Sequence, residues 1–544
     1  MNPLLDFAKV TDPATRRLRP TRASTPGEAF ISTEVELKLA APVPALQKLK
    51  CVLLAMPTAR SQVQSDLTST YYDTPDLALH RKQLTLRVRK QGRRYVQTVK
   101  AGDFAWSDLL ARRELEDCIA NKRPEFDAPK TGKRLPNSIH KHDLRPIFTT
   151  SITRTLIEIE PHTCTQIEAA IDEGEIRTAD GSRVEPISEI ELELRSGDRA
   201  ALFDVALRLL EAAPIRIETR SKAERGYRLL GVAGLPQAVH AGPVTLDPTM
   251  VVELALQRFG MQCLTQLLRN GPVLLANEPE GIHQMRVAVR RLRSVLSALK
   301  PILPLEHRRW VSEELKWLTH ALGPVRNWDI FATSLVRPVS DALSASPELE
   351  YLVRAAEQRR QAAFDDAKQA ILSERFTKSM LCLLRWFEAR EWREQPVSER
   401  AALLLAPIAN IAPELVERCY RRARKRSKRF AEQTPTQRHR LRIALKKLRY
   451  VVEFLESLFD EAQVRTFVNR LKSLQDFLGH ANDVRVAYDL LAELLEETNH
   501  DIPAIARAGG IMLGWHERGL ADREPSLRRH VRRFKSLEPL LVRS

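Results

Sequence analysis

The chain has 544 residues, of which 43% are hydrophobic, so it is too long for one core and has apolar material for two to four packed domains. Its formal net charge of +17 favours an anionic partner such as nucleic acid, a phosphate polymer or an acidic membrane surface. Its six scattered cysteines form no C-x-x-C pair, which argues against a disulfide scaffold or a cysteine zinc site and favours reduced thiols in a cytoplasmic protein.

The amino-terminal segment lacks the apolar centre of a signal peptide. No apolar run along the chain is long enough to span a bilayer, so we expect no membrane partner. Residues 1–28 are predicted to form a disordered, mildly basic leader.

The first predicted strand, Ser32–Leu39 (STEVELKL), carries all its charges on one face. Successive side chains of a strand point to opposite faces, so Val35, Leu37 and Leu39 share the other face. The charged positions are Glu34, Glu36 and Lys38. A later segment, Ser188–Arg195 (SEIELELR), repeats the pattern with Glu189, Glu191 and Glu193.

A sheet with one solvated face is the ordinary explanation of such alternation, but two features weigh against it. Carboxylates two residues apart lie about 6.6–7 Å from each other and repel by roughly 2.5 kcal/mol at an effective dielectric near 20. Other segments between Phe30 and Gly231 repeat the design with basic residues, namely Arg87, Arg89, Lys100, Arg154 and Lys222. A sheet that closes with its charged faces inward explains both, because glutamates hold hard divalent cations and basic groups hold an elongated polyanion.

A helical stretch at 198–213 follows these strands, and a segment rich in glycine and proline comes after it. We therefore predict a strand domain at 29–232 and a linker at 233–249.

Eight motifs of the strand domain occur in the order typical of one family. They are EVELK, YYDTPDLAL, LRVR, QTVK, RRELE, AAIDEGEI, EIELEL and SKAERGY. On these motifs the domain resembles a CYTH domain, of the triphosphate tunnel metalloenzyme family. The resemblance implies a closed antiparallel tunnel of eight strands that cleaves or rearranges triphosphates with Mg²⁺ or Mn²⁺.

The resemblance also implies roles for individual residues. The expected metal ligands are Glu34, Glu36, Glu189, Glu191 and Glu193. The expected phosphate-binding residues are Lys38, Arg87, Arg89, Lys100, Arg154 and Lys222. Glu114 and Asp172 would position metal or water and act with Lys38 in catalysis. Thr85 stands where the thiamine-triphosphate branch places an aromatic residue, which weakens a thiamine substrate.

From about residue 250 to residue 535 the apolar spacing is helical, and the segment repeats itself. The sequence HQMRVAVRRLRSVL from His283 matches HRLRIALKKLRYVV from His439, an offset of 156 residues (439 − 283). The same offset relates Gly323 to Gly479. We expect two copies of a multi-helix unit, at about 250–395 and 400–535.

Both repeated helices place a basic face opposite their apolar face. A solvated helix face is the common explanation, but such faces mix Glu with Lys, whereas this one has a single sign and occurs twice. The repeat resembles a CHAD domain, which implies a polyphosphate-binding groove. Its expected binding residues are His283, Arg286, Arg290, Arg293, His439, Arg442, Lys446 and Arg449. The runs at 421–430 and 528–534 add positive surface of unassigned role.

The expected fold is thus α+β and multidomain: a closed antiparallel β-tunnel with flanking helices, then an all-α duplicated bundle. The leading hypothesis is a metal-dependent inorganic triphosphatase that hydrolyses tripolyphosphate to pyrophosphate and phosphate, whose helical domain binds long-chain polyphosphate and associates with polyphosphate granules. The alternatives are a nucleoside triphosphatase or adenylate cyclase of the same family and a non-catalytic granule-binding protein. No specific nucleic-acid partner is expected, because the basic segments carry no interleaved aromatic platform and no reading-helix signature.

Overall fold

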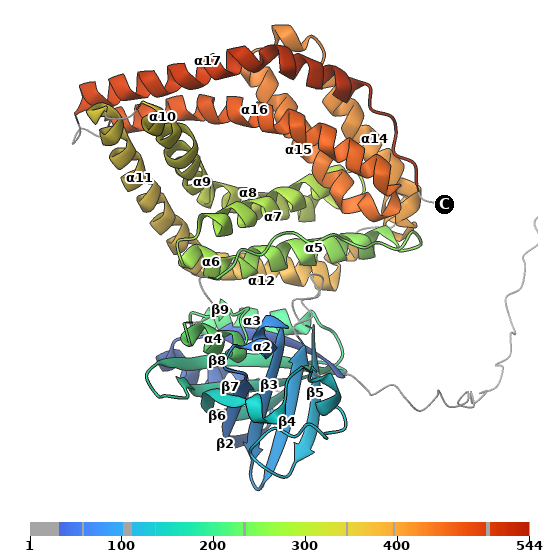
Figure 1. Cartoon of the computed structure of the whole chain (residues 1–544). Coiled ribbons are helices and arrows are strands. Elements are labelled where there is room, and N and C mark those ends of the chain that lie inside the picture. Colours follow the sequence, from blue (N-terminus) through green and yellow to red (C-terminus); the bar gives the residue numbers. More distant parts are fainter. Residues whose placement is uncertain are drawn as a thin grey trace, which may run out of the picture.

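The structure is a computed structural model that describes residues 32–56, 59–101, 111–136, 138–231, 236–343, 346–394, 398–496 and 501–542. The leader predicted at 1–28 lies outside these ranges. Figure 1 shows a strand-rich domain below an open ring of helices. Within the described residues, no helix is long and apolar enough to cross a membrane.

The strand-rich domain is built on a single antiparallel sheet. Its strands are β1 (Ser32–Ala40), β2 (Arg60–Asp73), β3 (Leu84–Gln91), β4 (Arg94–Ala101), β5 (Ala111–Ile119), β6 (Arg145–His162), β7 (Thr165–Thr178), β8 (Val184–Ser196) and β9 (Arg216–Ile217). The spatial order is β5-β4-β3-β2-β6-β7-β8-β1-β9, and β1 also pairs with β5 at the far end of this order. The first strand of this order, β5, is therefore also hydrogen-bonded to β1, the last but one.

The alternation in the strands separates an apolar face from a charged one, as the sequence predicts. Leu37, Leu39 and Leu192 are buried in an apolar core with the helices α1 (Val43–Leu54) and α3 (Ala201–Ala212). Short helical segments complete the domain: α2 (Ala78–Arg81), α4 (Lys222–Leu229), η1 (Gly132–Arg134) and η2 (Lys141–Asp143).

The second domain is helical throughout its described residues. Its first half contains α5 (Val252–Arg269), α6 (Gly271–Leu275), α7 (Pro279–Ala298), α8 (Leu305–Ala321), α9 (Gly323–Ile330), the π-helical η3 (Phe331–Val336), α10 (Arg337–Ala342), α11 (Pro347–Leu372), α12 (Glu374–Ala389) and η4 (Glu391–Glu394). Its second half contains α13 (Glu399–Ala402), η5 (Leu403–Leu405), α14 (Ile408–Arg426), η6 (Phe430–Glu432), α15 (Pro435–Leu455), η7 (Glu456–Leu458), α16 (Glu461–Glu496) and α17 (Ile502–Lys535).

Several helices of the two halves occupy corresponding positions. Helices α5 and α14 begin 156 residues apart, and so do α7 and α15, the offset found in the sequence. The backbones of Val251 and Pro407, also 156 residues apart, pair with each other in an antiparallel bridge. Residues at equivalent positions therefore meet at this bridge, as expected of two copies related by an approximate two-fold axis.

The two domains pack against each other through α3 and α12. Arg385 Nε lies 2.5 Å from Asp204 Oδ1, and Arg199 Nε lies 3.8 Å from Glu388 Oε2. The segment between the domains is attached to the helical domain, since Val244 and Leu246 are buried and Leu246 N donates to Ser457 Oγ at 3.0 Å. The glycine- and proline-rich connection is thus packed along its described part.

Candidate functional site

Three carboxylates meet on the charged face of the sheet. Asp172 of β7 faces Glu189 of β8 across the strand pair, and Glu191 follows two residues later on the same face. One oxygen from each of the three lies within 4.8 Å of the others. Asp172 and Glu189 are buried and Glu191 is nearly so, so this is a concentrated negative charge away from bulk water.

Three cations surround this triad. Lys222 Nζ lies 2.7 Å from Asp172 Oδ2 and 2.9 Å from Glu191 Oε1, and it also contacts Glu189. Lys38 Nζ lies 2.6 Å from Glu191 Oε1. Arg154 donates from Nε and Nη2 to the two oxygens of Asp172 at 2.7 and 2.6 Å, and from Nη2 to Glu191 at 2.6 Å. Each of the three carboxylates thus has a cationic partner.

The opposite charges shift the pKa values of Glu191, Lys222 and Arg154 toward the ionised form. Burial would raise the pKa of the Glu191 carboxyl, but Lys222 and Lys38 hold that pKa well below its usual value. Burial would lower the pKa of Lys222, but Glu191 and Glu189 raise it above its usual value. Burial would also lower the pKa of Arg154, which Glu191 and Asp172 raise instead.

A cluster of arginines continues the site on its other side. Arg87 is buried, and its Nη2 lies 3.6 Å from Glu116 Oε1. Arg89 Nε donates to Ser69 Oγ at 3.2 Å, and the pKa of Arg89 falls to about 10 because of burial and the nearby charges of Arg87 and Arg154. Arg154 therefore belongs to both the acidic and the basic part, and the site runs from carboxylates to guanidinium groups.

The structure brings together only some of the residues singled out in the sequence. Glu36 and Glu193 face each other on β1 and β8, one pair along from the triad, and Glu193 lies 2.5 Å from Arg195. Lys100 on β4 is half-buried. The side chains of Glu34 and Glu114 lie outside the described part of the structure.

One residue of the site was not assigned from the sequence. Arg225 is buried and donates from Nη1 to Glu189 at 3.1 Å and from Nε to Glu185 at 2.8 Å. It lies three residues after Lys222 on α4, whose start is capped by the side chain of Ser221. The i, i+3 spacing within SKAERGY is the signal that could have identified it.

A second charged region lies in the helical domain, where the basic faces of α7 and α15 meet. Burial and the charges of Arg290 and Arg442 lower the pKa of Lys446 to about 6. The pKa of Arg286 falls to about 10 because of burial and its neighbours Arg290 and Arg326. Each helix therefore adds positive charge to the same place. We call the cluster of Arg286, Arg290, Arg442 and Lys446 the basic groove, after the groove that the resemblance implies.

Its guanidinium groups are incompletely satisfied. The Nε atoms of Arg286, Arg290 and Arg442 are buried without a hydrogen-bond partner within the described structure. Burial and Arg326 lower the pKa of His283 to about 4, so its imidazole is neutral at pH 7. An unpaired buried donor is costly, and an anion in the groove would satisfy these groups.

The remaining predicted groove residues have partners of their own. Arg293 Nη1 donates to Thr319 Oγ1 at 3.0 Å, and Arg449 Nε lies 3.2 Å from Glu453. His439 Nδ1 lies 2.5 Å from Asn482 Oδ1. Asn482 of α16 thus orients a histidine of the groove.

Comparison with known proteins identifies both halves of the chain. The CYTH domain family matches residues 32–227, and the CHAD domain family matches residues 259–492. An inorganic triphosphatase of Haemophilus influenzae is 35% identical over 208 residues, which is 37% of this chain and 56% of that protein. An uncharacterized protein of Mycobacterium tuberculosis strain H37Rv is 27% identical over 397 residues, covering 66% of this chain and 69% of its own length.

Solved structures resemble each half. The CHAD domain of the plant Ricinus communis is 28% identical, with a TM-score of 0.49, and covers 56% of this chain and 99% of its own. The putative adenylyl cyclase HpAC1 from Hippeastrum, described as having a dominant triphosphatase activity, is 15% identical with a TM-score of 0.27, and covers 36% of this chain and 95% of its own.

Proposed function

Since the chain carries a CYTH domain over residues 32–227 and a CHAD domain over residues 259–492, we propose that it is a metal-dependent inorganic triphosphatase. It would hydrolyse tripolyphosphate to pyrophosphate and phosphate, while its helical domain binds long-chain polyphosphate. The observation that carries the proposal is the buried triad of Asp172, Glu189 and Glu191 beside a cluster of arginines.

The sheet supports a tunnel around this site. The pairing of β1 with both β8 and β5 supports a sheet that closes on itself, in which the charged faces of the strands would be directed toward a common interior. A tunnel walled by cations and carboxylates excludes bulk water, which strengthens the electrostatic interactions that phosphoryl transfer depends on.

The triad fits a divalent cation by its chemistry. Mg²⁺ and Mn²⁺ prefer oxygen ligands, and three carboxylates within 4.8 Å of one another present such a set. Asp172, Glu189 and Glu191 would hold the ion, which neutralises phosphate charge and lowers the pKa of a bound water when present.

The other residues of the site would bind and orient the substrate. Arg87 and Arg89 offer planar guanidinium groups that match the oxygens of terminal phosphates, and Arg154 joins them to the triad. Lys38 and Lys222 would exchange part of their carboxylate contacts for phosphate contacts. Phosphoanhydride hydrolysis needs this positioning and charge neutralisation more than a covalent nucleophile.

Long-chain polyphosphate is the ligand we propose for the basic groove. Two observations favour an elongated anion there: three buried Nε atoms lack partners within the described structure, and burial together with cationic neighbours lowers the pKa of Lys446. No carboxylate cluster comparable to the triad lies in the described part of the groove, so we assign it binding and no catalysis.

The similarity to an inorganic triphosphatase favours tripolyphosphate over nucleotides as the substrate. A nucleoside triphosphatase or adenylate cyclase is the second candidate, because the tunnel site recognises phosphates and not a base. Phosphate release from tripolyphosphate, ATP, thiamine triphosphate and long-chain polyphosphate, each with Mg²⁺, Mn²⁺ or EDTA, tests the proposal. We expect tripolyphosphate to be the best substrate and EDTA to abolish turnover; a clear preference for ATP would contradict the inorganic assignment.

A further inference from the structure

A second cationic site lies beside the basic groove. A cavity of about 290 Å³ opens where α14 and α15 meet the carboxyl-terminal end of α7. Its lining contains no carboxylate and four cationic side chains, Arg422, Arg426, Arg440 and Lys447. We call this cavity the lateral pocket.

The four cations have no acidic partner among the described residues. The ion pairs of α14 are made instead by Arg418 with Glu414 and by Arg421 with Glu417. Lys447 Nζ donates to Ser297 Oγ at 2.6 Å, and Arg426 Nη1 donates to the backbone oxygen of Arg440 at 2.9 Å. The charge of the lateral pocket is therefore not neutralised by the protein.

The cations also act on one another. The pKa of Lys447 is lowered by burial, with Arg422 among the charges that lower it further. Burial lowers the pKa of Arg426 too, and Arg422 and Arg440 add to this effect. Holding like charges together costs free energy, and a bound anion would offset that cost.

The duplication supplies an internal comparison. At the offset of 156 residues, the positions of Arg422, Arg426, Arg440 and Lys447 correspond to Gln266, Asn270, Gln284 and Arg291 in the first repeat. Cys419, which also lines the pocket, corresponds to Cys263. Three cations of the second copy thus stand where the first has neutral amides.

In the first repeat the corresponding region is closed by hydrogen bonds. Gln266 Nε2 donates to Gln284 Oε1 at 3.0 Å, and Asn270 exchanges two hydrogen bonds with the backbone of Val239, at 2.9 and 3.0 Å. Gln266 and Asn270 are fully buried. In the second repeat, Arg422 and Arg440 are exposed. The positions that form a buried hydrogen-bond network in the first repeat therefore line an open, cationic cavity in the second.

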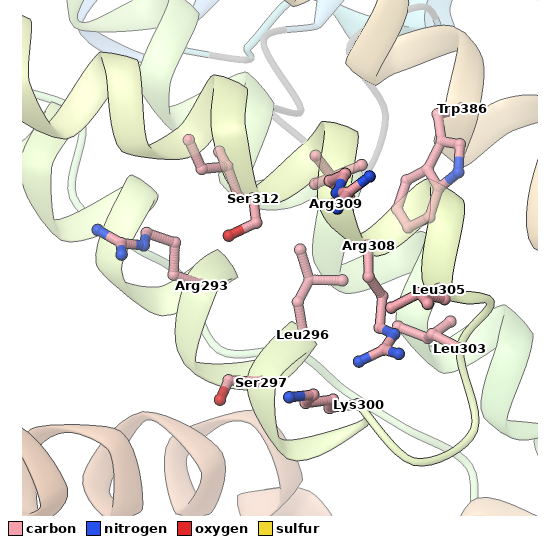
Figure 2. Close-up of a pocket in the computed structure, with 12 residues that line it drawn as sticks. Arg293, Leu296, Ser297, Lys300, Leu303, Leu305, Arg308, Arg309, Ser312 and Trp386 are labelled. Carbon is pink, nitrogen blue, oxygen red and sulfur yellow. The ribbon is translucent and has the colours of Figure 1, made fainter.

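A second cavity, which shares Ser297 with the lateral pocket, also has lining residues that differ in charge between the two repeats. Figure 2 shows it beside α7, with Arg293, Ser297 and Lys300 on its wall, and Ser297 lines the lateral pocket as well. At the equivalent positions of the second repeat, Ser297 and Lys300 become Glu453 and Glu456. These two positions are thus a serine and a lysine in the first repeat and glutamates in the second.

We propose that the lateral pocket binds a compact phosphate polyanion through Arg422, Arg426, Arg440 and Lys447. Several guanidinium groups around one cavity match the oxygens of adjacent phosphates, and the absence of a lining carboxylate favours a multiply charged ligand. The phosphates come either from a free short chain, such as pyrophosphate or tripolyphosphate, or from the end of a long chain held in the basic groove. The second source rests on the proposed function of the groove, whereas the first does not.

The test uses the full chain and a variant that copies the first repeat, Arg422→Gln/Arg426→Asn/Arg440→Gln. Its matched control, Arg421→Gln/Arg424→Gln/Lys425→Gln, removes the same charge from α14 outside the lateral pocket. Titration calorimetry in EDTA measures the affinity and number of sites for pyrophosphate and tripolyphosphate. A salt series measures binding of a long chain.

If the ligand is a free short chain, the variant that copies the first repeat should lose one binding site, whose affinity falls about tenfold or more. The control variant should keep this site. If the ligand is the end of a long chain, the plot of the logarithm of the binding constant against the logarithm of the salt concentration should become less steep. Its slope should fall in magnitude by about 2 to 3, as expected when three phosphate contacts are lost. Unchanged short-chain and long-chain binding in a folded variant would overturn the proposal. Tripolyphosphate turnover should be unaffected in both variants, so failure of the tunnel assignment would be seen separately. Thermal unfolding without ligand checks the fold, and the variant should be no less stable because it removes repelling charges.

Discussion

Replacing Glu191 by glutamine tests the acidic part of the candidate site in the strand-rich domain most directly. Glu191 contacts Lys38, Lys222 and Arg154 at 2.6, 2.9 and 2.6 Å, and it is one of the three candidate metal ligands. Glu191→Gln keeps the shape of the side chain and removes the charge that a hard cation and three buried cations require.

Two losses of different size are expected. Turnover of tripolyphosphate should fall at least about a hundredfold, which corresponds to about 2.7 kcal/mol of transition-state stabilisation. The free energy of unfolding without metal should fall by about 3–5 kcal/mol, because the buried cations lose one of three balancing charges. The lowered pKa of Glu191 has the same origin, and its contribution to stability is present above the unfolded pKa and lost as the pH falls through the folded pKa.

Phosphate release and urea unfolding measure the two losses, with Glu173→Gln as the control. Glu173 is exposed on β7, next to Asp172 and on the opposite face of the strand, so its replacement removes the same charge outside the site. The control should change turnover less than about threefold and stability by less than about 1 kcal/mol. If Glu191→Gln retained full turnover, Glu191 would not hold the metal.

The other predictions concern the arginines and the groove. Arg87→Ala and Arg89→Ala should raise KM for tripolyphosphate, lower kcat, or both, and Arg89→Lys should restore little, because a lysine lacks the planar fork; steady-state kinetics that match the wild type would remove these residues from the substrate site. Reversing the charges of Arg286, Arg290, Arg442 and Lys446 in the full chain should abolish long-chain polyphosphate binding and leave tripolyphosphate turnover largely intact. If binding were retained, these residues would have no role in polyphosphate binding. Because the pKa of Lys446 is lowered to about 6, this lysine is mostly neutral at pH 8 and should take up close to one proton when polyphosphate binds, which calorimetry in buffers of different ionisation enthalpy detects. Lys446→Arg, which stays charged, should remove that uptake and keep binding; an unchanged uptake would assign the proton to another group.

The same lowered pKa determines how stability depends on pH without ligand. An unfolded lysine titrates near 10.4, so between about pH 6 and 10 the unfolded chain binds the proton that the folded Lys446 has lost. The contribution of this group to the free energy of unfolding therefore increases with pH across that window.

The elements and their faces follow from local periodicity alone. A period of two places Glu34, Glu36 and Lys38 on one side of a strand whatever surrounds it, and a period of 3.6 places Arg286 and Arg290 on one side of a helix. The repeat offset of 156 residues is also a property of the sequence, and it recurs in the starts of α5 and α14. The two domain families follow from motifs that local patterning preserves.

Which of these residues meet depends on strand register and on long-range packing. Three alternating glutamates on β8 look equivalent in the sequence, but the register with β7 brings Glu189 and Glu191 to Asp172 and leaves Glu193 beside Arg195. Arg225 joins the site because α4 folds back onto the sheet.

The same holds for the helical domain, where the packing of α7 against α15 turned two separate basic faces into one groove. Equivalent positions of the two repeats became a closed amide network around Asn270 and an open cationic pocket around Arg426. Strand register, helix packing and the covering of a face by a distant segment depend on contacts between residues far apart in the chain, which local periodicity does not encode.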